Sequence, residues 1–379
     1  MSKIPFNKPF MTGKELDYIK EAVDRGHISG DGIFTKKCHA FFEETWGFKK
    51  TLLTTSCTAA LEMAAILSNI GPDDEVIIPS FTFPSTATAF ALRGATIIFA
   101  DSQKDHPNLD VDSLSPLITA KTKAIIPVHY GGVPCAMEQI MEIAEKHSLF
   151  VIEDAAQAID STYQGKPLGS IGHFGAFSFH ETKNISSGEG GLLAINDATY
   201  INRAEVIREK GTNRSAFFRG EIDKYGWVDI GSSFLPSDMT AAFLYAQLEN
   251  INTIQKKRKA LWNRYYQALT PLQEQGLLTL PPYSKENNGH VFYLLLPSLG
   301  ERSALIAHLA DQEIKAVFHY QSLHKSPYYH SRHDGRALPH ADYFSDCLLR
   351  LPLYASLELE DVDKITEMIG NFFHALPAR

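Results

Sequence analysis

The chain has 379 residues, of which 44% are hydrophobic and 21% are charged, and its formal net charge is −8. This composition is typical of a globular enzyme, and the length suggests a large domain with a smaller companion. The negative charge argues against a nucleic-acid-binding protein. The four cysteines are scattered without metal-ligand spacing, so we expect neither a disulfide framework nor a metal site.

The targeting signals of exported and membrane proteins are missing from the sequence. The first ten residues lack the apolar core of a signal peptide, and no run approaches the roughly 20 apolar residues of a membrane span. We therefore expect a cytoplasmic protein that acts on a small molecule, without a membrane or nucleic-acid partner.

The N-terminal part of the chain begins with helical patterns. Thr12 with Glu15 three residues later forms a capping-box signature, which predicts a helix over 12–23 with Thr12 as its N-cap. Two further helices are predicted over 34–46 and 57–68.

Short apolar runs follow, and helical stretches such as 137–147 separate most of them. Apolar strands between amphipathic helices require a sheet that is covered on both faces. The predicted fold class is therefore α/β with a mainly parallel sheet. The strands are predicted at 75–78, 95–100, 123–128 and 149–154, with a further buried strand at 175–179.

The last third of the chain has a different pattern. A long helical pattern over about 235–267 connects to an apolar run at 290–296 and a closing helix after Asp361. We predict a large domain over 1–249 and a smaller α+β C-terminal domain over 250–379.

Two ionisable side chains follow predicted strands, where ligands bind in an open α/β sheet. Asp154 ends the strand F-V-I-E-D, and Lys183 comes shortly after the strand at 175–179. Taken singly, the acid is explained as well by a helix N-cap, and a lone lysine is most often a surface residue.

Two other segments could complete a binding site. The hydroxyl-rich start of the helix at Cys57 and Thr58 is suited to an anion, although plain caps are far more common. Phe83, after the strand at 75–78, could stack on a planar ring, although most aromatic residues are core.

Together, these four features match the parts of pyridoxal 5′-phosphate. The helix start suits its phosphate, the aromatic residue its ring and the acid its pyridine nitrogen. The lysine suits its aldehyde, as a Schiff base, and could then move a proton. A purely structural α/β protein would not explain why these features coincide.

The motifs that contain these residues resemble the DegT-like family of sugar-nucleotide aminotransferases. The resemblance extends from Ile4 almost to the C-terminus and implies the fold of type I pyridoxal phosphate enzymes. The motifs are E-D-A-A-Q (153–157), S-F-H-E-T-K-N (178–184), S-G-E-G-G (187–191) and D-M-T-A-A-F-L-Y-A-Q-L (238–248).

The resemblance assigns a role to each cofactor residue. Lys183 would form the Schiff base, Asp154 would pair with the pyridine nitrogen, and Gln157 would lie near the ring hydroxyl. Phe83 would stack on the ring. Ser178 and the backbone amides of Cys57 and Thr58 would hold the phosphate.

The resemblance also implies a homodimer with shared active sites. The family motif G-x-N-[FY]-R, whose asparagine reaches the partner's cofactor phosphate, is replaced by G-S-S-F-L at 231–235. Ser233 could donate a hydrogen bond there, from a shorter side chain. Sugar contacts are suggested for His180, Arg219, Tyr320 and His324, and for His129, although such residues are more often structural or interface residues.

The implied reaction is transfer of an amino group from L-glutamate to the C4 ketone of dTDP-4-keto-6-deoxy-D-glucose, which gives dTDP-4-amino-4,6-dideoxy-D-galactose. Segments 208–215 and 229–233 resemble the family members that make this product for common antigen, a lipopolysaccharide-related surface polymer. Relatives with histidine at the lysine position are sugar 3-dehydratases, so Lys183 favours transamination. The alternatives are amination at C3, a UDP-sugar substrate, or a cofactor-binding regulatory protein.

Overall fold

The centre of the molecule is a seven-stranded sheet with the order β1-β9-β8-β5-β4-β2-β3. The structure is a computed structural model that describes residues 3–284 and 286–375. Neighbouring strands are parallel except where β9 pairs with β1 and β8. The strands are β1 (Lys50–Thr54), β2 (Glu75–Pro79), β3 (Thr96–Ala100), β4 (Thr122–Ile125), β5 (Phe150–Asp154), β8 (Phe174–Ser178) and β9 (Gly191–Ile195). The predicted α/β fold with a mainly parallel sheet is confirmed.

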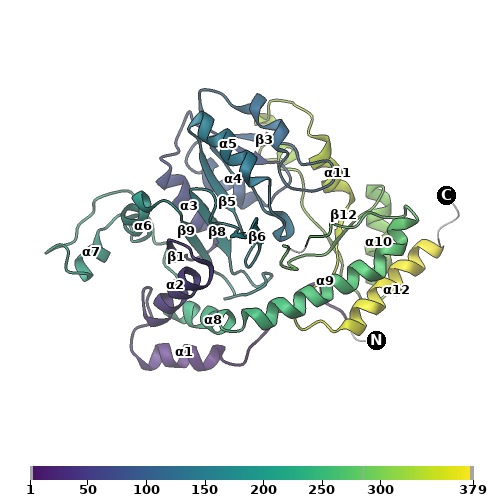
Figure 1. Cartoon of the computed structure of the whole chain (residues 1–379), viewed down its shortest axis with the longest axis horizontal. Helices are drawn as coiled ribbons and strands as arrows, with labels where there is room; N and C mark the ends of the chain where they lie inside the picture. The colour runs from purple at the N-terminus through teal and green to yellow at the C-terminus, as the bar shows by residue number, and fades with distance from the viewer. Residues whose placement is uncertain (1–2, 285, 376–379) are drawn as a thin grey trace.

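Helices cover both faces of this sheet (Figure 1). Leu193 and Ile78 face α3, α4 and α6, whereas their chain neighbours Leu192 and Ile77 face α2, α8 and α5. Successive side chains of a strand point to opposite faces, so continuous apolar strands serve both layers. These helices are α2 (Ile33–Trp46), α3 (Cys57–Leu67), α4 (Pro84–Ala91), α5 (Met137–His147), α6 (Ile201–Arg208) and α8 (Asp238–Leu248).

The C-terminal part has its own apolar core and a three-stranded antiparallel sheet, β10-β12-β11. In Figure 1 the long helix α9 runs from α8 to α10 and α12. Ile4 packs in this core and pairs with Ile314. The domain division at residue 249 stays a prediction. The elements are α9 (Ile251–Glu274), β10 (Tyr293–Leu295), α10 (Leu299–Asp311), β11 (Val317–Phe318), α11 (Pro339–Cys347), β12 (Leu348–Arg350) and α12 (Leu359–Ala375).

Two predicted helices differ from the observed ones. The first, α1 (Glu15–Asp24), begins after Gly13, whose φ of 98° is not helical. Glu15 still accepts the N–H groups of Thr12 and Gly13, but Thr12 is not the N-cap. The long helical segment forms two helices, because α8 ends at Leu248 and α9 begins at Ile251.

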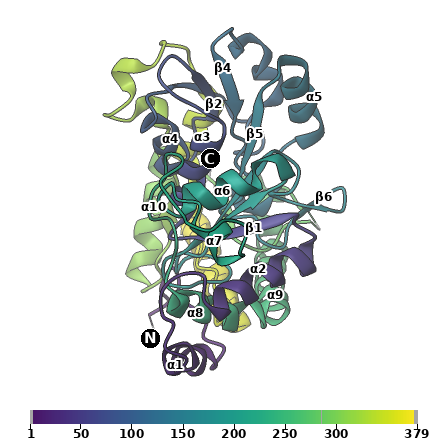
Figure 2. The ribbon, with the colours of Figure 1, turned by 90° about the vertical axis from the view of Figure 1, so that its left-hand side faces the viewer.

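An arm formed by residues 209–234 extends away from the sheet. It contains α7 (Arg214–Phe218), which lies at the far edge of the molecule in Figure 1 and beside α6 in Figure 2. Three of its aromatic side chains are exposed: Phe218 (69%), Tyr225 (53%) and Trp227 (84%). The arm therefore presents apolar surface that its own chain does not cover.

Within the described ranges, membrane-spanning and metal-binding features are not found. None of the helices there has the length and apolar character needed to cross a bilayer. No group of three His, Cys, Asp or Glu side chains that could hold a metal ion occurs there either.

Candidate active site

A cavity of about 830 Å³ lies at the carboxyl ends of the parallel strands. Asp154 is the last residue of β5 and Ser178 the last of β8, and these strands are parallel neighbours. Their ends therefore meet at one edge of the sheet. Most of the predicted site residues line the cavity: Cys57, Thr58, Phe83, Asp154, Gln157, Ser178, His180, Lys183 and Tyr320.

Lys183 lies in the turn after β8, where its N–H donates to the carbonyl of His180 at 2.9 Å. Burial lowers the pKa of Lys183 to about 8, although the charge of Asp154 opposes this shift. A substantial fraction of the amine is therefore unprotonated near neutral pH, as a nucleophile and proton carrier requires.

The next residue, Asn184, fixes the position of this turn. Its amide donates to Oε1 of Gln255 at 2.8 Å and to the carbonyl of Asn288 at 3.0 Å. Its Oδ1 lies 2.7 Å from Nδ1 of His290. The Lys183 backbone is thus held by α9 and by the segment before β10, which come from the C-terminal part.

Asp154 is 5% exposed, and each of its carboxylate oxygens accepts a hydrogen bond. The Thr86 hydroxyl donates to Oδ2 at 2.7 Å, and the Ala156 N–H donates to Oδ1 at 3.1 Å. Burial raises the pKa of Asp154, while these hydrogen bonds and the charge of Lys183 oppose the rise. A buried carboxylate in this setting suits a cationic ligand group.

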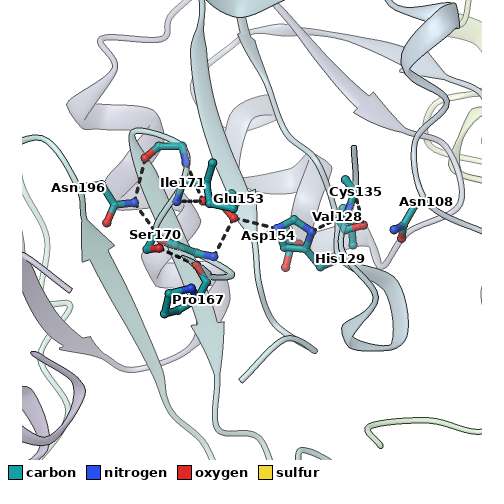
Figure 3. Close-up of polar contacts among 12 residues, drawn as sticks. Asn108, Val128, His129, Cys135, Glu153, Asp154, Pro167, Ser170, Ile171 and Asn196 are labelled. Atoms are coloured by element: carbon teal, nitrogen blue, oxygen red, sulfur yellow. Dashed lines mark hydrogen bonds and ion pairs between the residues drawn. The ribbon is translucent and has the colours of Figure 1, made fainter. Parts of the chain in front are cut away.

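Glu153, the neighbour of Asp154, does not line the cavity and forms the polar network in Figure 3. It accepts N–H groups of Gly169, Ile171 and Gly172, each at 2.7 Å, and Nε2 of His129 lies 2.9 Å away. Because the Cys135 N–H donates to Nδ1 of His129, the proton on Nε2 faces Glu153. His129 is fully buried and does not line the cavity, so the suggested sugar contact is not found there.

The start of α3 lines the cavity with its first-turn residues. The Ser56 side chain accepts the N–H of Ala59, and the N–H groups of Cys57 and Thr58 belong to the first turn, which has no helical acceptors. Burial raises the pKa of Cys57 well above its usual value, so the thiol stays neutral. A Cβ on Gly191 would lie 2.2 Å from the Ser56 carbonyl carbon, so this close approach requires glycine.

Gln157 connects the two parts of the chain across the cavity. Its Oε1 accepts the N–H of Gly131 at 2.7 Å, and its Nε2 donates to the Tyr320 hydroxyl at 3.0 Å. The ring of Phe83 lies 6.0 Å from that of Tyr320 and is 56% exposed. A planar ligand can therefore reach an aromatic face beside Gln157.

Besides His129, three predicted site residues lie outside this cavity. Arg219 and Ser233 are in the arm, where Arg219 forms ion pairs with Glu205 and Glu221 at 2.8 and 2.7 Å. His324 is 5% exposed and pairs with the Ser80 hydroxyl at 2.7 Å. His324 is a packed structural residue, so its expected sugar contact is not found in this cavity.

Several cavity residues were not predicted. Thr86 lies in the first turn of α4, and its position after the strand-end segment P-S-F-T-F-P was an available signal. His290, His319 and Arg350 come from the C-terminal part, and nothing in their local sequence points to the cavity.

Residues 9–370 match the model of the DegT/DnrJ/EryC1/StrS aminotransferase family. The chain belongs to this family. It is 34% identical to the spore coat polysaccharide biosynthesis protein SpsC of Bacillus subtilis, over 97% of this chain and 96% of that protein. The PLP form of Spr1654 from Streptococcus pneumoniae has 27% identity, full coverage of both chains and a TM-score of 0.90.

Helicobacter pylori PseC, an aminotransferase of pseudaminic acid biosynthesis, has the same fold with a TM-score of 0.91, at 24% identity over 99% of this chain and 100% of PseC. The predicted family and enzyme class are confirmed: the chain is a sugar aminotransferase. Because aminotransfer depends on pyridoxal phosphate in this family, the predicted cofactor is confirmed as well.

The residues of the cavity fit this cofactor. An amine with a lowered pKa, a buried carboxylate and a helix start with free N–H groups match its aldehyde, ring nitrogen and phosphate. Each lines the same cavity. Individual cofactor contacts by these residues remain predictions.

Proposed function

We propose that this sugar aminotransferase moves an amino group from L-glutamate to C4 of dTDP-4-keto-6-deoxy-D-glucose, which gives dTDP-4-amino-4,6-dideoxy-D-galactose. The observation that supports the transfer most directly is that Lys183 and Asp154 line one cavity. The substrate assignment rests on the resemblance of segments 208–215 and 229–233 to enzymes that form this product. The name of the relative SpsC, which assigns that protein to polysaccharide biosynthesis, is consistent with a role in a surface polymer such as common antigen.

In this proposal each side chain has a defined task. Pyridoxal phosphate, when bound, supplies an electron sink and carries the amino group between the two substrates. Lys183 would hold the cofactor between turnovers and move the proton at the reacting carbon, a task that its lowered pKa favours. Asp154, with its carboxylate fixed by Thr86 and Ala156, would keep the ring nitrogen protonated.

We further propose that the functional unit is a homodimer in which the arm reaches the partner's cavity. The exposed aromatic residues of the arm, with Trp227 at 84%, favour burial against a second copy. This would also explain why Arg219 and Ser233 lie outside the cavity of their own chain. Sedimentation of the wild type and of a Trp227→Lys variant tests this proposal, because the variant should shift toward a monomer.

The proposed reaction is tested by the visible absorption band of the protein loaded with pyridoxal phosphate. L-glutamate should bleach the band, and dTDP-4-keto-6-deoxy-D-glucose should then restore it. If glutamate bleaches the band but this sugar does not restore it, the substrate is wrong and C3-keto or UDP-linked sugars are tried next. If neither addition changes the band, L-glutamate is not the donor, and other amino acids are tried in its place.

A further inference from the structure

We propose that the buried pair Glu153 and His129 positions Asp154 for the reaction, by fixing the strand end from which the Asp154 carboxylate projects. Neither residue of the pair lines the cavity, so both act through other groups. The inference rests on the proposed role of Asp154 toward the ring nitrogen of the cofactor, and it is independent of which sugar is the substrate.

The carboxylate of Glu153 is fully buried and accepts four hydrogen bonds. Its Oε1 accepts the N–H groups of Ile171 and Gly172, and its Oε2 accepts the N–H of Gly169, each at 2.7 Å. Nε2 of His129 donates to the same Oε2 at 2.9 Å. An ionised carboxylate has acceptor sites for all four donors, whereas an amide would present its own N–H groups to some of them.

These donors come from both sides of β5, which lies between β4 and β8 in the sheet. His129 follows β4, and residues 169–172 precede β8 (Figure 3). The loop 169–172 lies directly over the start of β8, because a Cβ on Gly175 would be 2.2 Å from the carbonyl oxygen of Gly169. Glu153 therefore connects three parallel strands whose carboxyl ends point toward the cavity.

The segment that carries His129 also holds the backbone of Asp154. The Asp154 N–H donates to the carbonyl of Pro127 at 2.9 Å, and the His129 N–H donates to the carbonyl of Asp154 at 3.2 Å. Val128, between these two partners, pairs with Asp154 in a parallel bridge and lines the cavity. A displacement of His129 would therefore displace the backbone partners of Asp154.

The same segment reaches a second predicted cofactor residue, Gln157. The N–H of Gly131 donates to Oε1 of Gln157 at 2.7 Å, and the N–H of Gly132 donates to the carbonyl of His129 at 3.1 Å. The imidazole of His129 is fixed at both nitrogens, because the Cys135 N–H donates to Nδ1 at 3.2 Å. One anchored ring thus sets the position of a segment that contacts both Asp154 and Gln157.

This arrangement differs from the contacts that orient the carboxylate itself. Thr86 and Ala156 bind the two oxygens of Asp154, whereas the pair holds the end of β5. Reacting groups must be held within about 0.5 Å of the productive geometry, and packing behind them supplies this precision. Loss of the pair should therefore weaken the contact between Asp154 and the ring nitrogen, an effect that a pair needed only for stability would not have.

The test follows the proton on the ring nitrogen directly, without turnover. The protein is loaded with pyridoxal phosphate whose ring nitrogen is ¹⁵N, and the chemical shift of this nitrogen is measured by NMR against pH. An opposite charge nearby shifts a pKa by about 1–3 units. In Glu153→Gln and His129→Asn, the midpoint for loss of the proton should fall by about one pH unit, as part of this effect. Asp154→Asn calibrates the full shift.

Two control variants separate positioning from general loosening of the fold. His129→Gln keeps an N–H that can donate to Glu153, so its shift should be smaller than that of His129→Asn. Asp238→Asn weakens a different buried carboxylate, which accepts the N–H groups of Phe34 and Thr35 away from the cavity. It should lower the urea midpoint of unfolding and leave the NMR midpoint unchanged.

The remaining titratable groups that influence Asp154 stay the same in both pair variants. They are Lys183, Cys57 and Tyr320. A difference between Glu153→Gln or His129→Asn and the wild type therefore reports the pair itself.

An unchanged NMR midpoint in both pair variants would overturn the proposal, as would an equal shift in Asp238→Asn. If Glu153→Gln does not fold or load the cofactor, His129→Asn alone decides the case. If Asp154→Asn itself leaves the midpoint unchanged, the proposed role of Asp154 is refuted, and the inference about the pair falls with it.

Discussion

The two walls of the cavity differ in what they contribute. The wall formed by the large sheet holds Asp154 at the end of β5 and Lys183 in the turn after β8, the parallel neighbour of β5. The wall formed by the C-terminal part holds Tyr320, His319 and Arg350, which are polar groups on a separate small sheet and its flanking segment. The difference suggests that the first wall performs the chemistry and that the second wall selects and orients the substrates.

The largest expected effect comes from the first wall. Lys183→Ala should lower turnover by about 10³-fold or more, since a positioned acid–base group contributes about 10²–10⁴-fold. Steady-state rates with donor and keto sugar measure this loss, and Lys146→Ala, an exposed lysine on α5, serves as the control. Normal turnover in Lys183→Ala would contradict the assignment of the chemistry to this wall.

The pH dependence of cofactor uptake should report the lowered pKa of Lys183. Only the unprotonated amine can attack an aldehyde, and burial lowers this pKa to about 8. The rate of uptake by the apoprotein should therefore rise about tenfold per pH unit below 8 and level off above it. Stopped-flow absorbance measures the rate, and a rise that continues to pH 10 would show that the amine is not perturbed.

Removal of the Thr86 hydroxyl should have an intermediate effect. Thr86→Val loses the hydrogen bond to Asp154, and the pKa of this carboxyl should rise further. We expect kcat to fall about tenfold, because a hydrogen bond to a charged group contributes about 1.5–3 kcal/mol. Thr82→Val is the matched control, since its hydroxyl contacts Thr86 rather than the carboxylate. Equal losses in both variants would argue against a direct role for the Thr86 hydrogen bond.

A smaller effect is expected at the second wall. Tyr320→Phe loses the hydroxyl that accepts from Gln157. A neutral hydrogen bond contributes about 0.5–1.5 kcal/mol, so we expect a loss of about threefold in kcat/KM and normal cofactor loading. Rates of the two half-reactions measure the loss in kcat/KM. A loss as large as that of Lys183→Ala would remove the distinction between the walls.

The smallest kinetic effect should come from His324, which lies outside the cavity and contacts Ser80 and Phe99. His324→Asn removes the imidazole that pairs with the Ser80 hydroxyl and leaves only the backbone N–H of residue 324 as its partner, so the free energy of unfolding should fall by about 1 kcal/mol. Urea unfolding measures this change, and kcat should match the wild type. A rise in KM for the keto sugar alone would instead support the sugar contact that the resemblance suggests for His324.

The sequence alone predicted the first wall more completely than the second. Asp154 and Ser178 end buried apolar strands, and parallel strands bring such residues together whatever the details of packing. Thr86 was missed because its role depends on the angle at which α4 meets β5. Arg350 was missed because a strand-end arginine in a small antiparallel sheet has no local signature of a ligand site.

What the sequence determined by itself was the alternation of helices and strands, the family and the presence of Lys183 and Asp154 in one cavity, because these depend on local periodicity and on specific motifs. The tertiary structure decided which of the remaining polar residues meet them. It buried His129 and His324, moved Arg219 and Ser233 onto the arm and brought Arg350 to the cavity. These outcomes depend on long-range packing of α9 and the small sheet against the large one, which periodicity within a short window does not encode.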